Sequence, residues 1–97
     1  MSGRQNPEST VTLSCVLILF SIHYVLKAEK LLKNKGITHD VVPVPREISS
    51  DCGMALVFAC EQFPEVRELL SASQIAIARI YGKGQDGVYH EIAWKEQ

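Results

Sequence analysis

An almost unbroken run of apolar residues near the start of the chain constrains the fold more than any other feature. Residues 13–20 are apolar except for Ser14, include the β-branched Val16 and Ile18, and stop abruptly before Ser21. A short, continuously apolar segment of this kind is typical of a strand that is covered on both faces. We therefore expect residues 13–20 to form a central strand of a sheet.

A helix is expected directly after this strand, over residues 22–35. Ser21 is placed to cap it, because its hydroxyl can accept a hydrogen bond from a free amide of the first turn. Apolar residues then recur at helical spacing, and lysines take positions on the other faces. Gly36 follows as a residue that ends the helix, since glycine adopts a positive φ at little cost.

The remaining elements alternate in a pattern that predicts an α+β fold. Strands are expected over residues 37–44, 54–60 and 75–81, and Pro43 either places the first of these at a sheet edge or makes it end early. A second helix is expected from Pro64, and a glycine-rich turn over 82–87 precedes a short strand over 88–94. The order β-α-β-β-α-β predicts a ferredoxin-like sandwich with both helices on one face of the sheet and an appended C-terminal strand or tail.

The length of the chain sets the number of domains. Its 97 residues, 46% of them apolar, suffice for one modest core. We expect a disordered lead-in over residues 1–10, a single ferredoxin-like domain over 11–81, and a turn with an extra strand or tail over 82–97.

Charge and cysteine content exclude several classes of function. A formal net charge of −1 argues against nucleic acid as a main partner, because phosphate binding requires a clustered basic face. The apolar run is shorter than the about 20 residues of a membrane span, and no cleavage pattern of a signal peptide follows it. Three cysteines without a CxxC pair do not indicate a disulfide framework, and we expect a cytoplasmic protein.

The segment over residues 45–53 stands out, because a small domain does not need it to bury its core. Pro45 stiffens its start, Arg46 supplies a permanent positive charge, and Ser49, Ser50 and Asp51 can order a turn. Cys52 follows, and Gly53 would let the next backbone amide approach a partner closely. A cysteine reacts as its thiolate, which Arg46 would favour and the neighbouring carboxylates would oppose.

Two interpretations of Cys52 stay open on these residues: a reactive thiol, or a small apolar side chain packed under the loop. Cys15 and Cys60 are interpreted as packed core and strand-end residues. The histidines, His23, His39 and His90, form no nucleophile–base pattern with a cysteine, and the last two are interpreted as surface residues. No metal site and no cofactor are expected, because the paired ligand spacings of a zinc site are absent.

Several motifs together resemble one family of known proteins. The chain is similar to the DUF3343 family of selenium/sulfur carrier-like proteins over roughly residues 16–81, in the motifs Phe20-Ser21-x-His23, Leu26-Lys27-Ala28-Glu29-Lys30-Leu31-Leu32-Lys33, Gly36-Ile37 and Pro43-x-Pro45-Arg46-x-Ile48-Ser49-Ser50-x-Cys52-Gly53-x-Ala55-Leu56. This resemblance implies that Cys52 is the carrier cysteine and that Arg46, Ser49, Ser50 and Gly53 form its setting.

Two main functions are therefore weighed. The first is a carrier that holds sulfur or selenium on Cys52 as a persulfide, taken from a donor such as a cysteine desulfurase and passed to an acceptor protein. The second is a binding module in which Arg46, Ser49 and Ser50 hold an anion and Cys52 is structural. A structural protein that docks a partner through the tail after Tyr81 is a third alternative, and a homodimer stays open.

Overall fold

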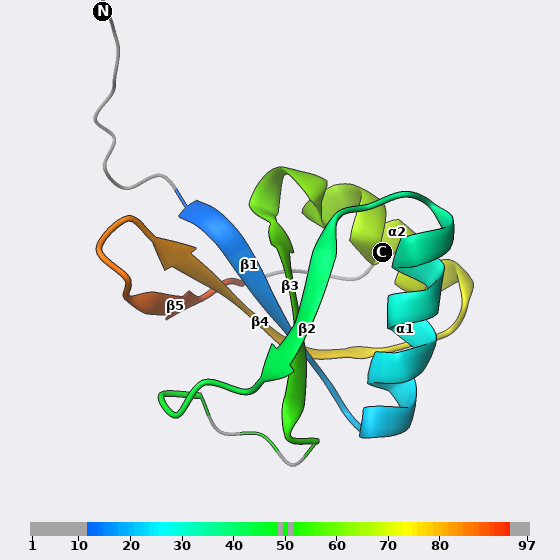
Figure 1. The fold of residues 1–97 in the computed structure, drawn as a ribbon, viewed down its shortest axis with the longest axis horizontal. Helices are drawn as coiled ribbons and strands as arrows, with labels where there is room; N and C mark the ends of the chain where they lie inside the picture. Colours follow the sequence, from blue (N-terminus) through cyan, green and yellow to red (C-terminus); the bar gives the residue numbers. More distant parts are fainter. Residues whose placement is uncertain (1–11, 49, 51, 94–97) are drawn as a thin grey trace, which may run out of the picture.

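Five strands form one antiparallel sheet in the order β2-β3-β1-β4-β5, with two helices (Figure 1). The structure is a computed structural model, and it describes residues 12–48, 50 and 52–93. The elements are β1 (Thr12–Leu19), α1 (Ile22–Asn34), β2 (His39–Pro43), β3 (Met54–Ala59), the 3-10 turn η3 (Cys60–Gln62), α2 (Phe63–Ala72), β4 (Ile77–Gly84) and β5 (Tyr89–Glu91). The expected lead-in over residues 1–10 lies outside the described residues.

The apolar run forms the central strand of the sheet, as predicted. β1 pairs with β3 on one side and with β4 on the other, so that Val16 lies opposite both Val57 and Tyr81. Leu17 and Val16 point to opposite faces and are both buried. Burial on both faces explains why this strand lacks the alternation of apolar and polar residues that marks a half-exposed strand.

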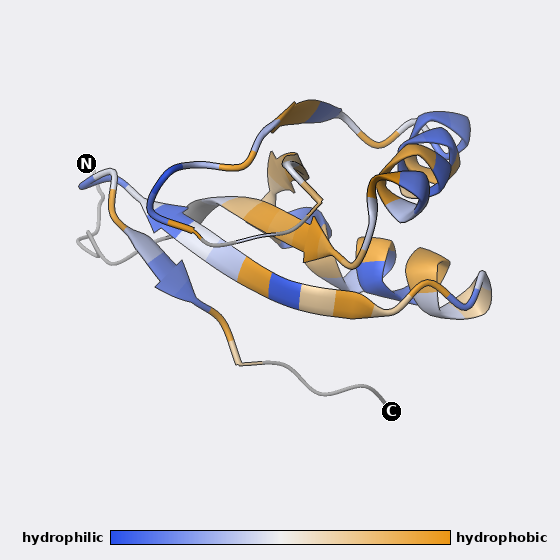
Figure 2. Ribbon diagram, turned by 90° about the horizontal axis from the view of Figure 1, so that it is seen from below, coloured by the Kyte–Doolittle hydropathy of each residue, from blue (hydrophilic) through white to orange (hydrophobic). Residues whose placement is uncertain are grey.

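Both helices cover the same face of the sheet, and a loop covers part of the other (Figure 2). On the helix side, Leu17 of β1 belongs to a core that also holds residues from α1 and α2, among them Leu32 and Leu70. On the other face, Ile48 from the loop between β2 and β3 packs with Val16, Ile18 and Ala55 in a second cluster. This architecture is an α+β fold compatible with the ferredoxin-like arrangement expected from the sequence.

The limits of α1 follow from local chemistry. The side chain of Ser21 accepts a hydrogen bond from the amide of Tyr24 at 3.3 Å, which confirms the predicted cap. At the other end Gly36 adopts a φ of +74°, and the amide of Ile37 donates to the carbonyl of Leu32 at 2.9 Å. This pair of features is a Schellman ending, which requires a positive φ after the last helical residue.

The C-terminal part of the sheet differs from the sequence-based expectation. We predicted a turn at Gly82 and Gly84, but both belong to β4, where Gly82 pairs with Cys15 of β1. The turn begins at residue 85, directly after Gly84, and Gly87 is the residue with positive φ there. β5 then returns as the predicted short strand along β4, whereas Trp94 lies outside the described residues.

A disulfide joins Cys15 of β1 to Cys60 of η3, which corrects the expectation that the cysteines stay unpaired. Cys15 lies opposite Phe58 in the register of β1 and β3, and Cys60 is two residues beyond Phe58. Two cysteines so placed face the same side of the sheet at neighbouring positions, and their Cα atoms are 5.0 Å apart. The bond ties the first strand to the segment that leads into α2.

The edge strand β2 is held to α1 by an ion pair. His39 donates from Nε2 to Oε2 of Glu29 at 2.8 Å, while its Nδ1 lies 2.7 Å from the carbonyl of Ile37. Burial lowers the pKa of His39, but the hydrogen bonds to Glu29 and Ile37 and the nearby carboxylate charges outweigh it and raise the pKa. His39 is thus a partner in the packing of α1 on the sheet, and not the free surface residue that we expected.

Reduction of the Cys15–Cys60 disulfide is expected to lower the free energy of unfolding by about 2–4 kcal/mol, because the bond restrains the unfolded chain over a sequence separation of 45 residues. Denaturant titrations with and without a phosphine reductant measure this difference. The Cys15→Ser/Cys60→Ser double variant is the control and should not respond to the reductant. A denaturation midpoint of the wild type that does not change on reduction would contradict the stabilising role of the disulfide.

The ion pair predicts a pH-dependent part of the stability. Because the pKa of His39 is raised above its ordinary value of 6.5, its contribution is complete below that value and is lost as the pH rises through the folded-state pKa. The hydrogen bond from His39 also lowers the pKa of Glu29 from 4.5, so the carboxylate stays ionised throughout this window. The destabilisation caused by Glu29→Gln should therefore be largest near pH 5.5 to 6 and shrink toward pH 9, whereas Glu68→Gln, on an exposed position of α2, should show no such trend.

Candidate functional site

The loop between β2 and β3 holds the candidate thiol at one end of the sheet. The amide of Val44 donates to the carbonyl of Gly53 at 3.1 Å, which closes the loop at its base. Ile48 donates to the carbonyl of Pro45 at 2.9 Å, and its own side chain is only 5% exposed against the helix-free face. The buried Ile48 side chain anchors the middle of the loop against this face of the sheet.

The thiol of Cys52 is half-buried and hydrogen-bonded at two points. Its Sγ lies 3.0 Å from the carbonyl oxygen of Met54, to which it donates, and 3.3 Å from Oγ of Ser50. The same Ser50 oxygen accepts from the amide of Cys52 at 3.3 Å, so one hydroxyl holds both the backbone and the sulfur. Gly53 continues the chain with a φ of +78°, a conformation that a side chain would strain.

This geometry assigns different partners to the two protonation states of the sulfur. A thiol has a proton to donate, and the Met54 carbonyl receives it. A thiolate, or the anion of a persulfide, has no proton to donate and needs a donor instead. Among the residues that the structure describes, the hydroxyl of Ser50 lies 3.3 Å away and can rotate to donate to an anionic sulfur.

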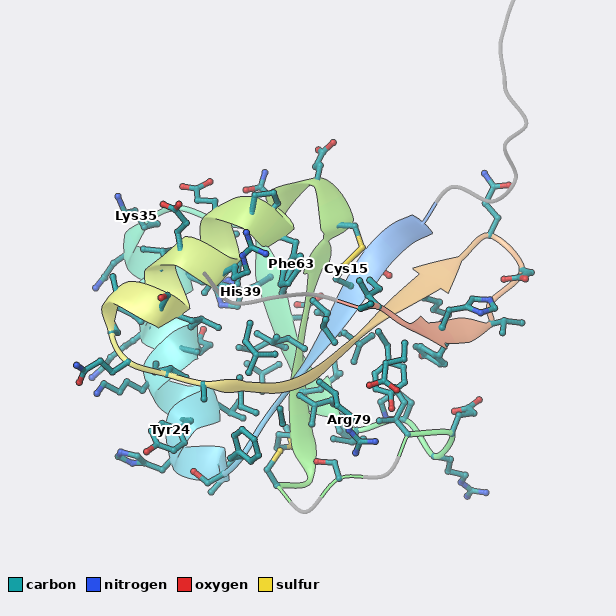
Figure 3. All side chains as sticks on the ribbon, turned by 180° about the vertical axis from the view of Figure 1, so that it is seen from behind. Cys15, Tyr24, Lys35, His39, Phe63 and Arg79 are labelled. Carbon is teal, nitrogen blue, oxygen red and sulfur yellow. A yellow bond between two sulfur atoms is a disulfide. The ribbon has the colours of Figure 1, made fainter. Side chains whose placement is uncertain are left out.

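Cys52 is the free thiol of the chain, because all three cysteines are described and the other two are bonded to each other. Figure 3 shows that disulfide at Cys15, near the start of β1. Cys52 precedes β3 whereas Cys60 follows it, so the thiol and the disulfide lie at opposite ends of that strand. Disulfide exchange between them would require the fold to open.

The surroundings of Cys52 contain neither a general base nor a metal site among the residues that the structure describes. No group of three histidine, cysteine or carboxylate side chains there is placed to hold a metal ion. His23 is exposed on α1, with its ring 5.6 Å from that of Tyr24, and has no contact with the sulfur. In the described part of the chain, no helix is long and apolar enough to cross a membrane.

An open depression of about 260 Å³ lies beside Ser50, where β1 ends and β4 runs past. Phe20 and Arg79 line it with Ser50, and Arg79 also donates to the hydroxyl of Tyr81 at 3.1 Å. Arg79 is labelled in Figure 3 on the same end of the molecule as the loop. Another depression, of about 520 Å³, lies at the opposite end beside Gly36 and Glu61, away from the thiol loop.

The structure brings together some of the residues singled out in the sequence and separates others. Ser50 contacts Cys52 directly, and Gly53 provides the backbone turn after it. Arg46 lies exposed in the turn between Pro45 and Ile48, and among the described residues no contact joins it to the sulfur. Ser49 and Asp51 lie outside the described residues, so their expected roles stay predictions.

Sequence reasoning missed three parts of this site. The Met54 carbonyl carries no signal, because every residue has one. Phe20 looked like the last core residue of the apolar run, although it is 62% exposed beside the loop. Arg79 lies in the strand pattern of residues 75–81, and only the pairing of β4 with β1 places it next to Ser50.

The comparisons with known proteins give one match. The model of a family described as "Putative Se/S carrier protein-like" matches residues 14–82, which run from most of β1 through most of β4 and include the whole thiol loop. No curated protein and no solved structure matches the chain.

Ser50→Ala is expected to slow the alkylation of Cys52 by iodoacetamide about tenfold to a hundredfold at constant pH, because a hydrogen bond to a charged group contributes roughly 1.5–3 kcal/mol. Ser50→Thr keeps the hydroxyl and should react more nearly at the wild-type rate. Ser71→Ala, on an exposed position of α2, is the control for a general effect. Equal alkylation rates in Ser50→Ala and the wild type would show that Ser50 only shapes the loop.

Proposed function

Because the chain belongs to the family of Se/S carrier protein-like chains, we propose that it carries sulfur or selenium on Cys52 and passes it to a partner protein. The observation that supports this most is a single free thiol at the end of the loop, with a hydroxyl at 3.3 Å. Such a thiol can accept and release a chalcogen atom by exchange.

The proposed loading step is a thiol exchange that conserves atoms and electrons. The Cys52 thiolate attacks the outer sulfur of a persulfide on a donor enzyme such as a cysteine desulfurase. A sulfur–sulfur bond forms at Cys52, the corresponding bond on the donor breaks, and the donor cysteine leaves as a thiolate. Unloading reverses the roles, since a thiolate of the acceptor protein attacks the outer sulfur and frees Cys52.

The half-buried position of Cys52 supports a holding role between these two steps. A persulfide is open to oxidation and to attack by small thiols in proportion to its exposure. Cys52 packs against the helix-side core, and Ser50 is placed to donate to the outer or inner sulfur when it is anionic. Partial burial thus limits unwanted reactions while leaving one side open to a protein partner.

The proposed chemistry also bears on the compartment. A thiol that exchanges sulfur works under reducing conditions, which supports the cytoplasmic location inferred from the sequence. The Cys15–Cys60 disulfide would meet the same reductants there; Cys15 is buried, whereas Cys60 is half-buried.

The loading step predicts one added sulfur on Cys52 when the protein is incubated with a cysteine desulfurase and cysteine. Intact-mass analysis without reductant, followed by peptide mapping, should find that sulfur on Cys52 alone. Cys52→Ser should abolish the adduct, whereas Cys15→Ser/Cys60→Ser should keep it. If the wild type gains no sulfur and Cys52 also alkylates slowly, the carrier proposal fails and an anion-binding module becomes the better account.

A further inference from the structure

Exposed apolar side chains gather in one short segment beside the thiol loop. Of the five large hydrophobic residues that the described structure leaves exposed, four lie between residues 20 and 26. Phe20 and Leu26 are the most exposed of them, at 62% and 59%, and Ile22 follows at 44%. Ile22 and Leu26 are four residues apart and share one side of α1, next to Phe20. Exposed apolar surface gathered in this way on a small domain marks a surface that another molecule covers.

This patch begins at the candidate site. Phe20 and Ser50 line the same depression, and Ser50 lies 3.3 Å from the Cys52 sulfur. In Figure 1 the start of β3 and the start of α1 lie at the same end of the molecule. A protein that covered Phe20 would therefore stand next to the thiol.

The patch continues along the outer face of α1 and becomes basic. His23, Leu26, Lys27 and Lys30 follow at spacings of three and four residues, so they share one helix face, where they line an open groove of about 260 Å³. Glu29, the acidic residue of α1, is engaged with His39 on β2 and does not neutralise these lysines. In Figure 3, Tyr24 marks the end of α1 near the loop and Lys35 marks the far end.

We propose that this docking face, defined by Phe20, Ile22, Leu26, Lys27 and Lys30, binds the sulfur-donor enzyme through a surface that presents acidic side chains around an apolar group. The inference rests on the proposed function of Cys52. We assign an acidic partner because this helix face is positive, whereas the chain as a whole has a net charge of −1. Apolar contact at Phe20 and Leu26 then sets the donor's persulfide against Cys52, and the lysines steer the encounter.

The test compares two charge reversals of equal size. Lys27→Glu/Lys30→Glu alters the docking face, whereas Lys35→Glu/Lys83→Glu alters two lysines outside it, one after the end of α1 and one in β4. Loading of Cys52 by a cysteine desulfurase with cysteine should fall about tenfold or more in kcat/KM for the first variant, mainly through KM, and within about threefold for the second. Leu26→Ser should also raise KM, and added salt should slow wild-type loading.

Two further readouts separate the docking face from the chemistry of the thiol. Alkylation of Cys52 by neutral iodoacetamide should proceed at the wild-type rate in Lys27→Glu/Lys30→Glu, because the intrinsic reactivity is unchanged. Loading of the wild type by inorganic polysulfide tests whether Cys52 holds a persulfide at all. Failure of that loading would overturn the proposed function itself, independently of the docking face.

The remaining outcomes overturn the docking face alone. Polysulfide loading without desulfurase loading, or desulfurase loading that is equal in all variants, would exclude this surface as the donor's binding site. Self-association in sedimentation that Lys27→Glu/Lys30→Glu abolishes, with loading unchanged, would assign the face to a second copy of the chain.

Discussion

The burial of β1 on both faces is the constraint on which the other parts of the molecule depend. The helix side of the strand contributes Leu17 to the core with α1 and α2, and the opposite side contributes Val16 and Ile18 to the cluster under the loop. β3 and β4 pair along its two edges. Since this one strand positions both helices and the loop that carries Cys52, the thiol's location follows from the same burial that drives folding.

The candidate site lies where the chain leaves the buried strand β1 and becomes exposed. The strand's apolar run passes from the buried Leu19 to the strongly exposed Phe20 without any change in the character of the sequence. At this point the loop returns toward β3, with Ser50 near Phe20 and Cys52 near Ser50. The site is thus built from the loop at a sheet end, where a thiol can be held by local hydrogen bonds and still meet a partner.

Local chemistry made the helices and most strands predictable from the sequence. Ser21 and Gly36 limit α1 through interactions within a few residues, and Pro43 marks an edge strand because it lacks an amide donor. Features that depend on pairing across the sheet were not predictable in this way. Gly82 resembles a turn residue until its pairing with Cys15 is known, and the Cys15–Cys60 bond follows from the register of β1 and β3.

In the candidate site, too, some features could be predicted from the local sequence and others depend on the fold. Cys52 and Ser50 are two residues apart, and their neighbourhood could be anticipated from the loop's composition. Ile48 looked like one apolar residue in a polar loop, and only the three-dimensional fold reveals that it anchors the loop on the helix-free face. The partnership of His39 with Glu29 joins a strand to a helix across ten residues and carries no local signal.

Transfer of a labelled sulfur tests the central claim most directly. Protein loaded on Cys52 with isotopically labelled sulfur would be isolated and mixed with an acceptor protein that carries a free thiol, without any donor present. The carrier account predicts that the label appears on the acceptor as a persulfide while Cys52 returns to its free thiol and the Cys15–Cys60 bond is unchanged. Label that stays on Cys52, or that is released as free sulfide without reaching the acceptor, would contradict it.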